Sequence, residues 1–106
     1  MPLAARETDA VATGHACDGN TTLDTPSQTT VTIEGKLAAR LADKTVVHNI
    51  KTGTKSNGDD KCDPHTAPIK GSSSNVYIVG ALAARKTDGC DAGSITGSAS
   101  KTYIGG

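Results

Sequence analysis

The apolar residues of this chain fall into short runs that recur. Leu-Ala-Ala-Arg occurs three times, and an aspartate follows each copy at the same offset. A second motif closes each unit, with a β-branched residue, an Ile two places later and a Gly two places after that. Self-similarity of this kind indicates a repeat protein. The repeats span approximately residues 1–36, 37–81 and 82–106, and together they fit one domain.

The closing motifs predict short strands at residues 30–35, 75–80 and 101–106. Val, Ile and Thr at alternate places are typical of half-buried strands. Gly-Ser turns at 71–72 and 97–98 precede the last two of these strands and separate each from an earlier short strand. No segment resembles a long helix. The sequence therefore predicts an all-β fold of short strands, in which three similar units give pseudo-threefold symmetry.

The second repeat is longer than its neighbours. Copies of Leu-Ala-Ala-Arg start at 3, 37 and 82, so they are 34 and then 45 residues apart. The difference falls in residues 51–64, a polar segment that contains an Asn-Gly pair. Insertions belong in loops and Asn-Gly is a turn signal, so this segment is expected to be a surface loop.

The composition leaves little material for a core. The chain has no Trp or Phe, and its aromatic residues are Tyr77 and Tyr103. We expect these two to pack in the core, with contact to a partner surface as the alternative. Aromatic rings normally supply the largest units of buried area. A chain this poor in large apolar side chains usually needs a disulfide, a metal ion or a partner surface for stability.

Charge and targeting signals narrow the class of protein. Eleven basic and eleven acidic side chains cancel, which argues against a nucleic-acid partner and against an anionic membrane surface. No apolar stretch is long enough for a signal peptide or a membrane span. We therefore expect synthesis in the cytoplasm, where thiols stay reduced. Three cysteines are an odd number, and reduced Cys together with His favours a metal over disulfides.

The candidate metal ligands are His15, His48, His65 and Cys90. Each lies in a segment that follows an Ala-Ala-Arg motif, so the repeats are expected to bring them together at one end. Three His and one Cys would complete a closed, tetrahedral zinc site of the structural kind. Cys62 lies three residues before His65, a spacing that chelates locally, and it is an alternative to one of the four. Cys17 is a weaker candidate and is expected to be a reduced loop cysteine.

The Arg of each motif stands three residues before its Asp. The pairs are Arg6 with Asp9, Arg40 with Asp43, and Arg85 with Asp88. This spacing permits a charge-assisted contact around a turn. Three copies at one offset favour a structural role for these charges, and nothing in them suggests catalysis.

These features together resemble the proline-alanine-alanine-arginine (PAAR) repeat proteins. The resemblance rests on the three Ala-Ala-Arg…Asp segments, the closing strands, the His or Cys in each following segment, and the terminal Ile104-Gly105-Gly106. It covers essentially the whole chain. The position of the family's first Pro is taken by Leu, at Leu3, Leu37 and Leu82.

The resemblance implies a small cone of short β-strands with one structural Zn²⁺ near its apex, held by His15, His48, His65 and Cys90. It implies a chain that is monomeric on its own and caps a trimeric β-helical spike, one tip per trimer. The spike belongs to a contractile phage tail or a type VI secretion system. The expected function is mechanical piercing of a target cell membrane from the virion tail tip or the secretion-system spike tip, and no enzymatic activity is expected.

Other classes of protein remain as alternatives. A zinc enzyme would keep an open metal position beside a Glu or Asp base, yet Glu7 and Glu34 lie outside the ligand segments. A cytoplasmic zinc-stabilised module that binds protein or nucleic acid is the main alternative. A secreted disulfide domain ranks last, because it would leave one thiol unpaired and lacks a signal sequence.

Overall fold

The computed structural model describes residues 2–105, so Met1 and Gly106, the outer ends of the first and third predicted repeats, lie outside the described residues. Within this range there are ten strands and no helix, which confirms the all-β prediction. No helix in residues 2–105 is long and apolar enough to cross a membrane. The strands are β1 (Ala10–Ala12), β2 (Asn20–Thr22), β3 (Thr32–Ile33), β4 (Lys36–Leu37), β5 (His48–Thr54), β6 (Asp60–His65), β7 (Tyr77–Ile78), β8 (Ala81–Leu82), β9 (Gly89–Cys90) and β10 (Gly93–Ile95).

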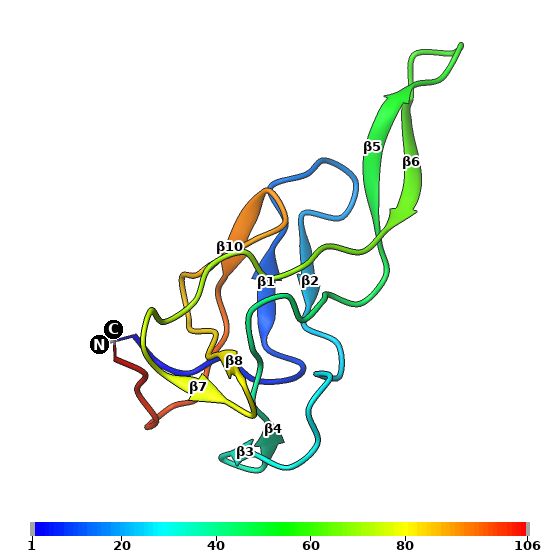
Figure 1. The fold of residues 1–106 in the computed structure, drawn as a ribbon. Coiled ribbons are helices and arrows are strands. Elements are labelled where there is room, and N and C mark those ends of the chain that lie inside the picture. Colours follow the sequence, from blue (N-terminus) through cyan, green and yellow to red (C-terminus); the bar gives the residue numbers. More distant parts are fainter. Residues whose placement is uncertain (1, 106) are drawn as a thin grey trace.

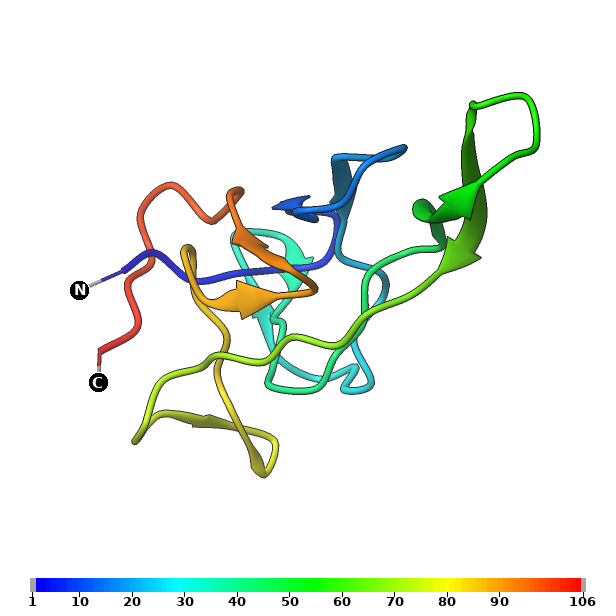
Figure 2. The ribbon, with the colours of Figure 1, turned by 90° about the horizontal axis from the view of Figure 1, so that it is seen from above.

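The strands form one small sheet and three hairpins. The sheet has the order β2-β1-β10-β9, and the hairpins are β3–β4, β5–β6 and β7–β8. The molecule is elongated, with extents of 48 × 24 × 21 Å. The β5–β6 hairpin projects at one end, which we call the hairpin end (Figure 1). Hairpins β3–β4 and β7–β8 form the opposite, lower end, and the two ends of the chain lie together beside β7 (Figure 1). Seen from above, hairpin β5–β6 lies on the side away from both chain ends (Figure 2).

The three Leu-Ala-Ala-Arg segments contact one another through their backbones. The N–H of Ala5 donates to the carbonyl of Ala84 (3.1 Å). The N–H of Ala84 donates to Ala39 (3.0 Å), and the N–H of Ala39 donates to Ala5 (3.0 Å), which closes a ring of three bonds. A methyl side chain at each position allows the segments to approach this closely.

Two apolar clusters lie on the two sides of this ring. Successive side chains of an extended segment point in opposite directions, so the two alanines of each copy separate. The first alanines enter a lower cluster, which comprises Ala4, Ala38, Ile78, Ala83, Ala99 and Ile104. The second alanines enter a middle cluster, which comprises Ala5, Val11, Leu23, Ala39, Ile69, Ala84, Cys90 and Ile95. All three copies thus build the core together.

A β-turn follows the Arg of each copy. In each turn the Asp N–H donates to the Arg carbonyl (3.1–3.2 Å), and the Asp carboxylate accepts the Arg N–H (2.7–2.8 Å). The third residue of each turn has a left-handed backbone, with φ of 65° at Thr8, 76° at Ala42 and 77° at Thr87. The offset between Arg and Asp is the same in all three copies because the Asp carboxylate caps the turn.

The predicted Arg–Asp contact is confirmed in two copies and wrong in one. The guanidinium of Arg6 binds Asp9 (3.1 Å), and that of Arg85 binds Asp88 (3.0 Å). The guanidinium of Arg40 instead donates to the Val79 carbonyl (2.8 Å). It turns away because Ser27 occupies the Asp43 carboxylate, to which it donates its N–H and its hydroxyl. The Arg40 guanidinium in turn donates to the Ser27 hydroxyl.

The closing motifs form hairpins rather than single strands. Residues 32–33 and 77–78 are extended as predicted, and each leads into the next Leu-Ala-Ala-Arg copy through a two-residue turn. Both turn residues have positive φ: Glu34 and Gly35 have 51° and 84°, and Val79 and Gly80 have 49° and 83°. Such type I′ turns match the twist of the flanking strands. At the third motif, Tyr103 makes one bridge to Leu3.

The prediction that the tyrosines pack in the core is wrong. Tyr77 is 65% exposed and Tyr103 is 55% exposed. The core around the ring is packed mostly with Ala, Val and Ile side chains, and these leave no room for aromatic rings. Tyr77 lies in β7, and the exposed Val79 lies in the turn that follows it. The exposed Val31 precedes β3, and Tyr103 lies near the C-terminus, so all four are at the lower end.

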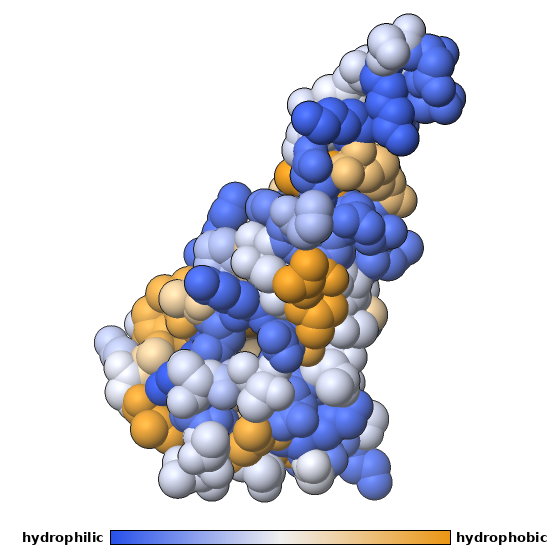
Figure 3. Space-filling view, turned by 90° about the vertical axis from the view of Figure 1, so that its right-hand side faces the viewer, coloured by the Kyte–Doolittle hydropathy of each residue, from blue (hydrophilic) through white to orange (hydrophobic). Residues whose placement is uncertain are grey.

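The prediction of a loop at residues 51–64 is also wrong, although its turn is confirmed. These residues form most of hairpin β5–β6, with Gly58 in the turn at φ 91°. An insertion that projects into solvent still has backbone donors and acceptors, and pairing two strands satisfies them. The outer part of the hairpin is strongly hydrophilic, whereas apolar atoms show nearer the body of the protein (Figure 3). Its first cross-strand pair is His48 with His65.

Candidate metal centre

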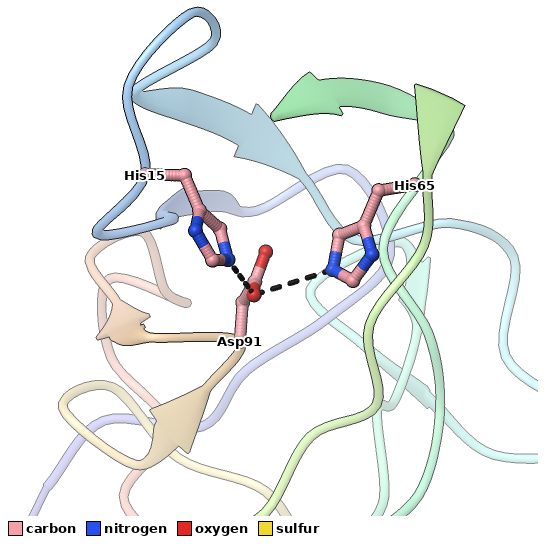
Figure 4. Close-up of side chains that lie close together, drawn as sticks. All are labelled: His15, His65 and Asp91. Carbon is pink, nitrogen blue, oxygen red and sulfur yellow. Dashed lines mark hydrogen bonds and ion pairs between the residues drawn. The ribbon is translucent and has the colours of Figure 1, made fainter. Parts of the chain in front are cut away.

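Four segments converge where the hairpin joins the body of the protein. His15 comes from the loop between β1 and β2, and His65 from the last position of β6 (Figure 4). His48 is the first residue of β5, directly opposite His65. Asp91 lies in the turn between β9 and β10. Residues up to 76 positions apart in the chain thus meet at one point.

The loop that carries His15 is held tightly against the β9–β10 turn. The Thr13 carbonyl accepts the N–H of Ala92 (3.0 Å). Gly14 has φ 74°, and a Cβ there would lie 2.5 Å from the Ala92 carbonyl oxygen, so only glycine permits this approach. The hydroxyl of Thr13 accepts the N–H of His15 (3.1 Å) and donates to the Asp18 carbonyl (2.7 Å). The loop therefore presents His15 to Asp91 in one position.

All three imidazoles point at the carboxylate of Asp91. The Nε2 atoms of His15 and His65 lie 2.5 Å and 3.3 Å from Oδ1. Nε2 of His48 lies 2.8 Å from Oδ2. The ring centroid of His65 lies 5.6 Å from that of His15 and 5.1 Å from that of His48, with the planes nearly perpendicular. The rings thus surround one small volume.

The hydrogen bonds of His48 determine whether its Nε2 atom, which faces Asp91, carries a proton or a free lone pair. Its Nδ1 lies 3.0 Å from the Val46 carbonyl, which only accepts, so Nδ1 carries a proton and donates it. A neutral His48 then directs the Nε2 lone pair at the Asp91 oxygen. Two lone pairs at 2.8 Å repel, so a second proton or a cation must lie between these atoms. A carbonyl partner on the other ring nitrogen is typical of metal-ligating histidines.

The electrostatics of Asp91 also favour positive charge. Burial alone raises the pKa of this carboxyl, but hydrogen bonds to His48 and His15 and the charges of His15 and His65 outweigh it and hold the pKa below its ordinary value. The side chain is only 5% exposed. The nearly buried carboxylate of Asp91 is therefore held in its ionised form and favours a positive charge beside it.

The donor set fits a metal ion. One nitrogen of His15, one of His65 and one oxygen of Asp91 all lie within 4.8 Å of one another. In a tetrahedral site with bonds of about 2.0 Å, the ligand atoms are about 3.3 Å apart, close to the His65–Asp91 separation. Imidazole and carboxylate suit Zn²⁺ and other divalent first-row metals. The group His15, His65 and Asp91 could therefore hold a metal ion. His48 lies beside this group, where its Nε2 contacts the second oxygen of the same carboxylate.

The structure brings together three of the four predicted ligands. His15, His48 and His65 meet, whereas Cys90 is 0% exposed and belongs to the middle cluster. Burial, together with the charge of Asp91, raises the pKa of the Cys90 thiol to about 11. The role of Cys90 as a ligand stays a prediction.

Sequence reasoning missed Asp91. The only available signal was its position directly after Cys90. Asp91 is the first residue of the turn between β9 and β10, and its left-handed backbone (φ 58°) sets the direction of its side chain. Neither the end of β9 nor this backbone conformation can be read from the sequence.

The prediction for the other two cysteines is wrong. Cys17 and Cys62 form a disulfide, with Cα atoms 6.2 Å apart. Cys17 is therefore not a reduced loop cysteine, and Cys62 is not an alternative ligand. The pairing follows from the hairpin, because β5 places Ile50 in a bridge with Cys17 and the next residue, Lys51, pairs with Cys62.

A scan against models of protein families finds no match to this chain, and no curated protein matches it at a significant level.

Proposed function

We propose that this chain is a structural spike-tip protein that caps a trimeric β-helical spike of a contractile injection machine, a phage tail or a type VI secretion system. It is not an enzyme on this proposal. The observation that carries the proposal is the closed ring of hydrogen bonds among Ala5, Ala39 and Ala84. A single chain that arranges three equivalent segments around one axis matches a partner with threefold symmetry, one copy per trimer.

The repeats support this pseudo-threefold arrangement at several levels. Each copy contributes one alanine to each cluster, and each is followed by the same capped turn. The elongated dimensions, 48 Å along one axis and 21–24 Å across, support a small cone with the hairpin end as its apex. The hairpin end would meet the target cell membrane during injection.

The lower end has the properties that docking requires. Val31, Tyr77, Val79 and Tyr103 are all at least 36% exposed there. Val79 also adopts φ 49°, which is unfavourable for a β-branched residue. Strain at an exposed apolar residue supports a role in contact with a partner, because folding alone does not call for it.

Zinc at the histidine cluster completes the proposal. His15, His48 and His65 would hold one structural Zn²⁺, with Asp91 or Cys90 as the fourth ligand. The apolar clusters lie below this point, so a metal ion would supply the rigidity that the hairpin end lacks. We place the working protein at the virion tail tip or the secretion-system spike tip, after synthesis in the cytoplasm.

Native mass spectrometry tests this proposal. The purified chain is measured with zinc, alone and with a trimeric β-helical spike fragment. We expect one zinc ion per chain and one chain per trimer. Tyr77→Asp, at the lower end, should abolish the complex, whereas the matched variant Lys55→Asp, on the exposed hairpin, should leave it intact. Failure of the chain to bind the trimer would refute the spike-tip proposal. Binding of the trimer by a chain that holds no zinc would refute only the proposed structural zinc site.

A further inference from the structure

The Cys17–Cys62 disulfide joins the two segments that carry the outer donors of the metal centre. Cys17 is two residues after His15, and Cys62 is three residues before His65. Cys17 lies in the loop between β1 and β2, and Cys62 lies in β6. The covalent bond therefore links the His15 loop to the strand that ends in His65.

The four donors of the centre differ in how firmly the body of the protein holds them. The side chains of His48 and Asp91 are 3% and 5% exposed. Those of His15 and His65 are 26% and 30% exposed. The disulfide is thus attached to the two donors that have the least packing around them.

Hydrogen bonds between the His15 loop and the hairpin reach β5. The N–H of Lys51 donates to the Ala16 carbonyl (3.2 Å), and the N–H of Asp18 donates to the Asn49 carbonyl (3.0 Å). The N–H of Asn49 donates to the Asp18 carboxylate (2.8 Å). The disulfide adds a covalent link from this loop to β6. His65 stands at the end of that strand.

The disulfide is open to a reductant in solution. Cys17 and Cys62 are both exposed residues. A thiolate in solution can therefore reach either sulfur of this bond. Cys90 is fully buried, so it cannot attack the disulfide and rearrange it.

We propose that the Cys17–Cys62 disulfide is a redox latch on the metal centre: a dithiol reductant opens it, frees the His15 loop from β6 and weakens the hold on the metal ion. A thiolate of the dithiol attacks one sulfur, the S–S bond breaks, and a mixed disulfide forms. The second thiol of the reductant then displaces the protein sulfur. Overall the protein gains two electrons and two protons, and the dithiol becomes a disulfide.

The latch acts through preorganisation. In the oxidised chain His15 and His65 already face Asp91, so binding a metal costs little ordering. In the reduced chain β6 and the loop move more independently, and the ion must order them. The inference requires the histidine cluster but not the spike-tip function, so either can fail without the other.

The test compares the zinc affinity of oxidised chain, chain reduced with a phosphine, and the variant C17S/C62S, by competition with a chromophoric chelator. We expect the last two to bind zinc about tenfold more weakly than the oxidised chain, the scale of losing an outer-shell support. Hydrogen exchange at residues 60–65 should speed up in both, while exchange at residues 83–85 in the ring stays slow and shows that the fold is kept. Reoxidation should restore the affinity of the wild type.

A hairpin variant that keeps the disulfide is the matched control. K55S/K61S changes two exposed side chains of the hairpin region and should retain the affinity of the oxidised wild type. Equal zinc affinity and equal exchange in the oxidised and reduced chains would overturn the proposal. So would tighter binding on reduction, which would mean that the free thiolates become ligands, or no zinc binding in either form.

Discussion

The lower part of the molecule and the hairpin end are stabilised by different means. Below the metal centre, three copies of one short motif bury alanines and isoleucines in two clusters and share a ring of backbone hydrogen bonds. At the hairpin end most side chains are exposed, and a disulfide and the histidine cluster take the place of a core. Repetition builds a core from small residues, whereas a single insertion has to be fixed by local bonds.

The largest expected effect is the loss of a middle-cluster side chain. Ile95 is 1% exposed and packs among residues of all three repeats. Ile95→Ala should lower the free energy of unfolding by about 3 kcal/mol, because it removes buried methyl groups and leaves a cavity. Urea denaturation measures this. Val47→Ala, at a position 67% exposed beside the hairpin, should change it by less than about 0.5 kcal/mol. An equal decrease in the free energy of unfolding for both variants would contradict the proposed difference in stabilisation between the two regions.

Next comes the choice of the fourth ligand. If Asp91 holds the metal, Asp91→Asn should weaken zinc binding by about a hundredfold, at least the loss seen for outer-shell partners. Cys90→Ser should then lower thermal stability, because it buries a hydroxyl, with zinc affinity little changed. Isothermal titration with zinc distinguishes the two residues. The reverse outcome would restore the sequence-based assignment of Cys90.

A smaller effect concerns the strained turn of the lower end. Val79 occupies the first position of a type I′ turn with φ 49°, where Asn is favoured. Val79→Asn should raise the free energy of unfolding by about 1 kcal/mol, since it relieves the left-handed strain of a β-branched residue. On the spike-tip proposal it should also weaken docking to the trimer. An unchanged or lower melting temperature would show that the turn is not strained.

The smallest effect is an acid-sensitive contact at the lower end. The Glu34 carboxylate accepts bonds from the Ser100 hydroxyl (2.8 Å) and N–H (3.1 Å), from the Lys101 N–H (3.0 Å) and from the Thr102 hydroxyl (2.9 Å). The Ser100 hydroxyl contributes most to lowering the pKa of Glu34 from 4.5 to about 2.

A pKa lowered on folding stabilises the folded chain above the unfolded value, and the contribution is lost as the pH falls from about 4.5 towards 2. The protection factors of amides 100–102, which are exchange rates measured by NMR and corrected for the intrinsic effect of pH, should fall across this range in the wild type. In Glu34→Gln the exchange should be faster at neutral pH and show no such step. Identical pH profiles would remove Glu34 from the contacts that hold the C-terminal segment.

The sequence alone determined the all-β class of the fold. Alternating Val, Ile and Thr, with no segment that resembles a long helix, predicted short strands. It also identified the three histidines that meet, because each occupies a segment after the same motif. These features are encoded locally or by repetition, so they can be counted along the chain.

Only the tertiary structure decided the partners across the fold. That Cys90 faces the core while Asp91 faces the imidazoles depends on where β9 ends and on the left-handed turn residue that follows it. The pairing of Cys17 with Cys62 depends on the register of β5 with β6, in a segment whose composition reads as a loop. The exposure of Tyr77 and Tyr103 depends on a core already filled by smaller residues. Each of these features depends on which residues, far apart in the sequence, come into contact in the fold. A single sequence gives no information about those distances.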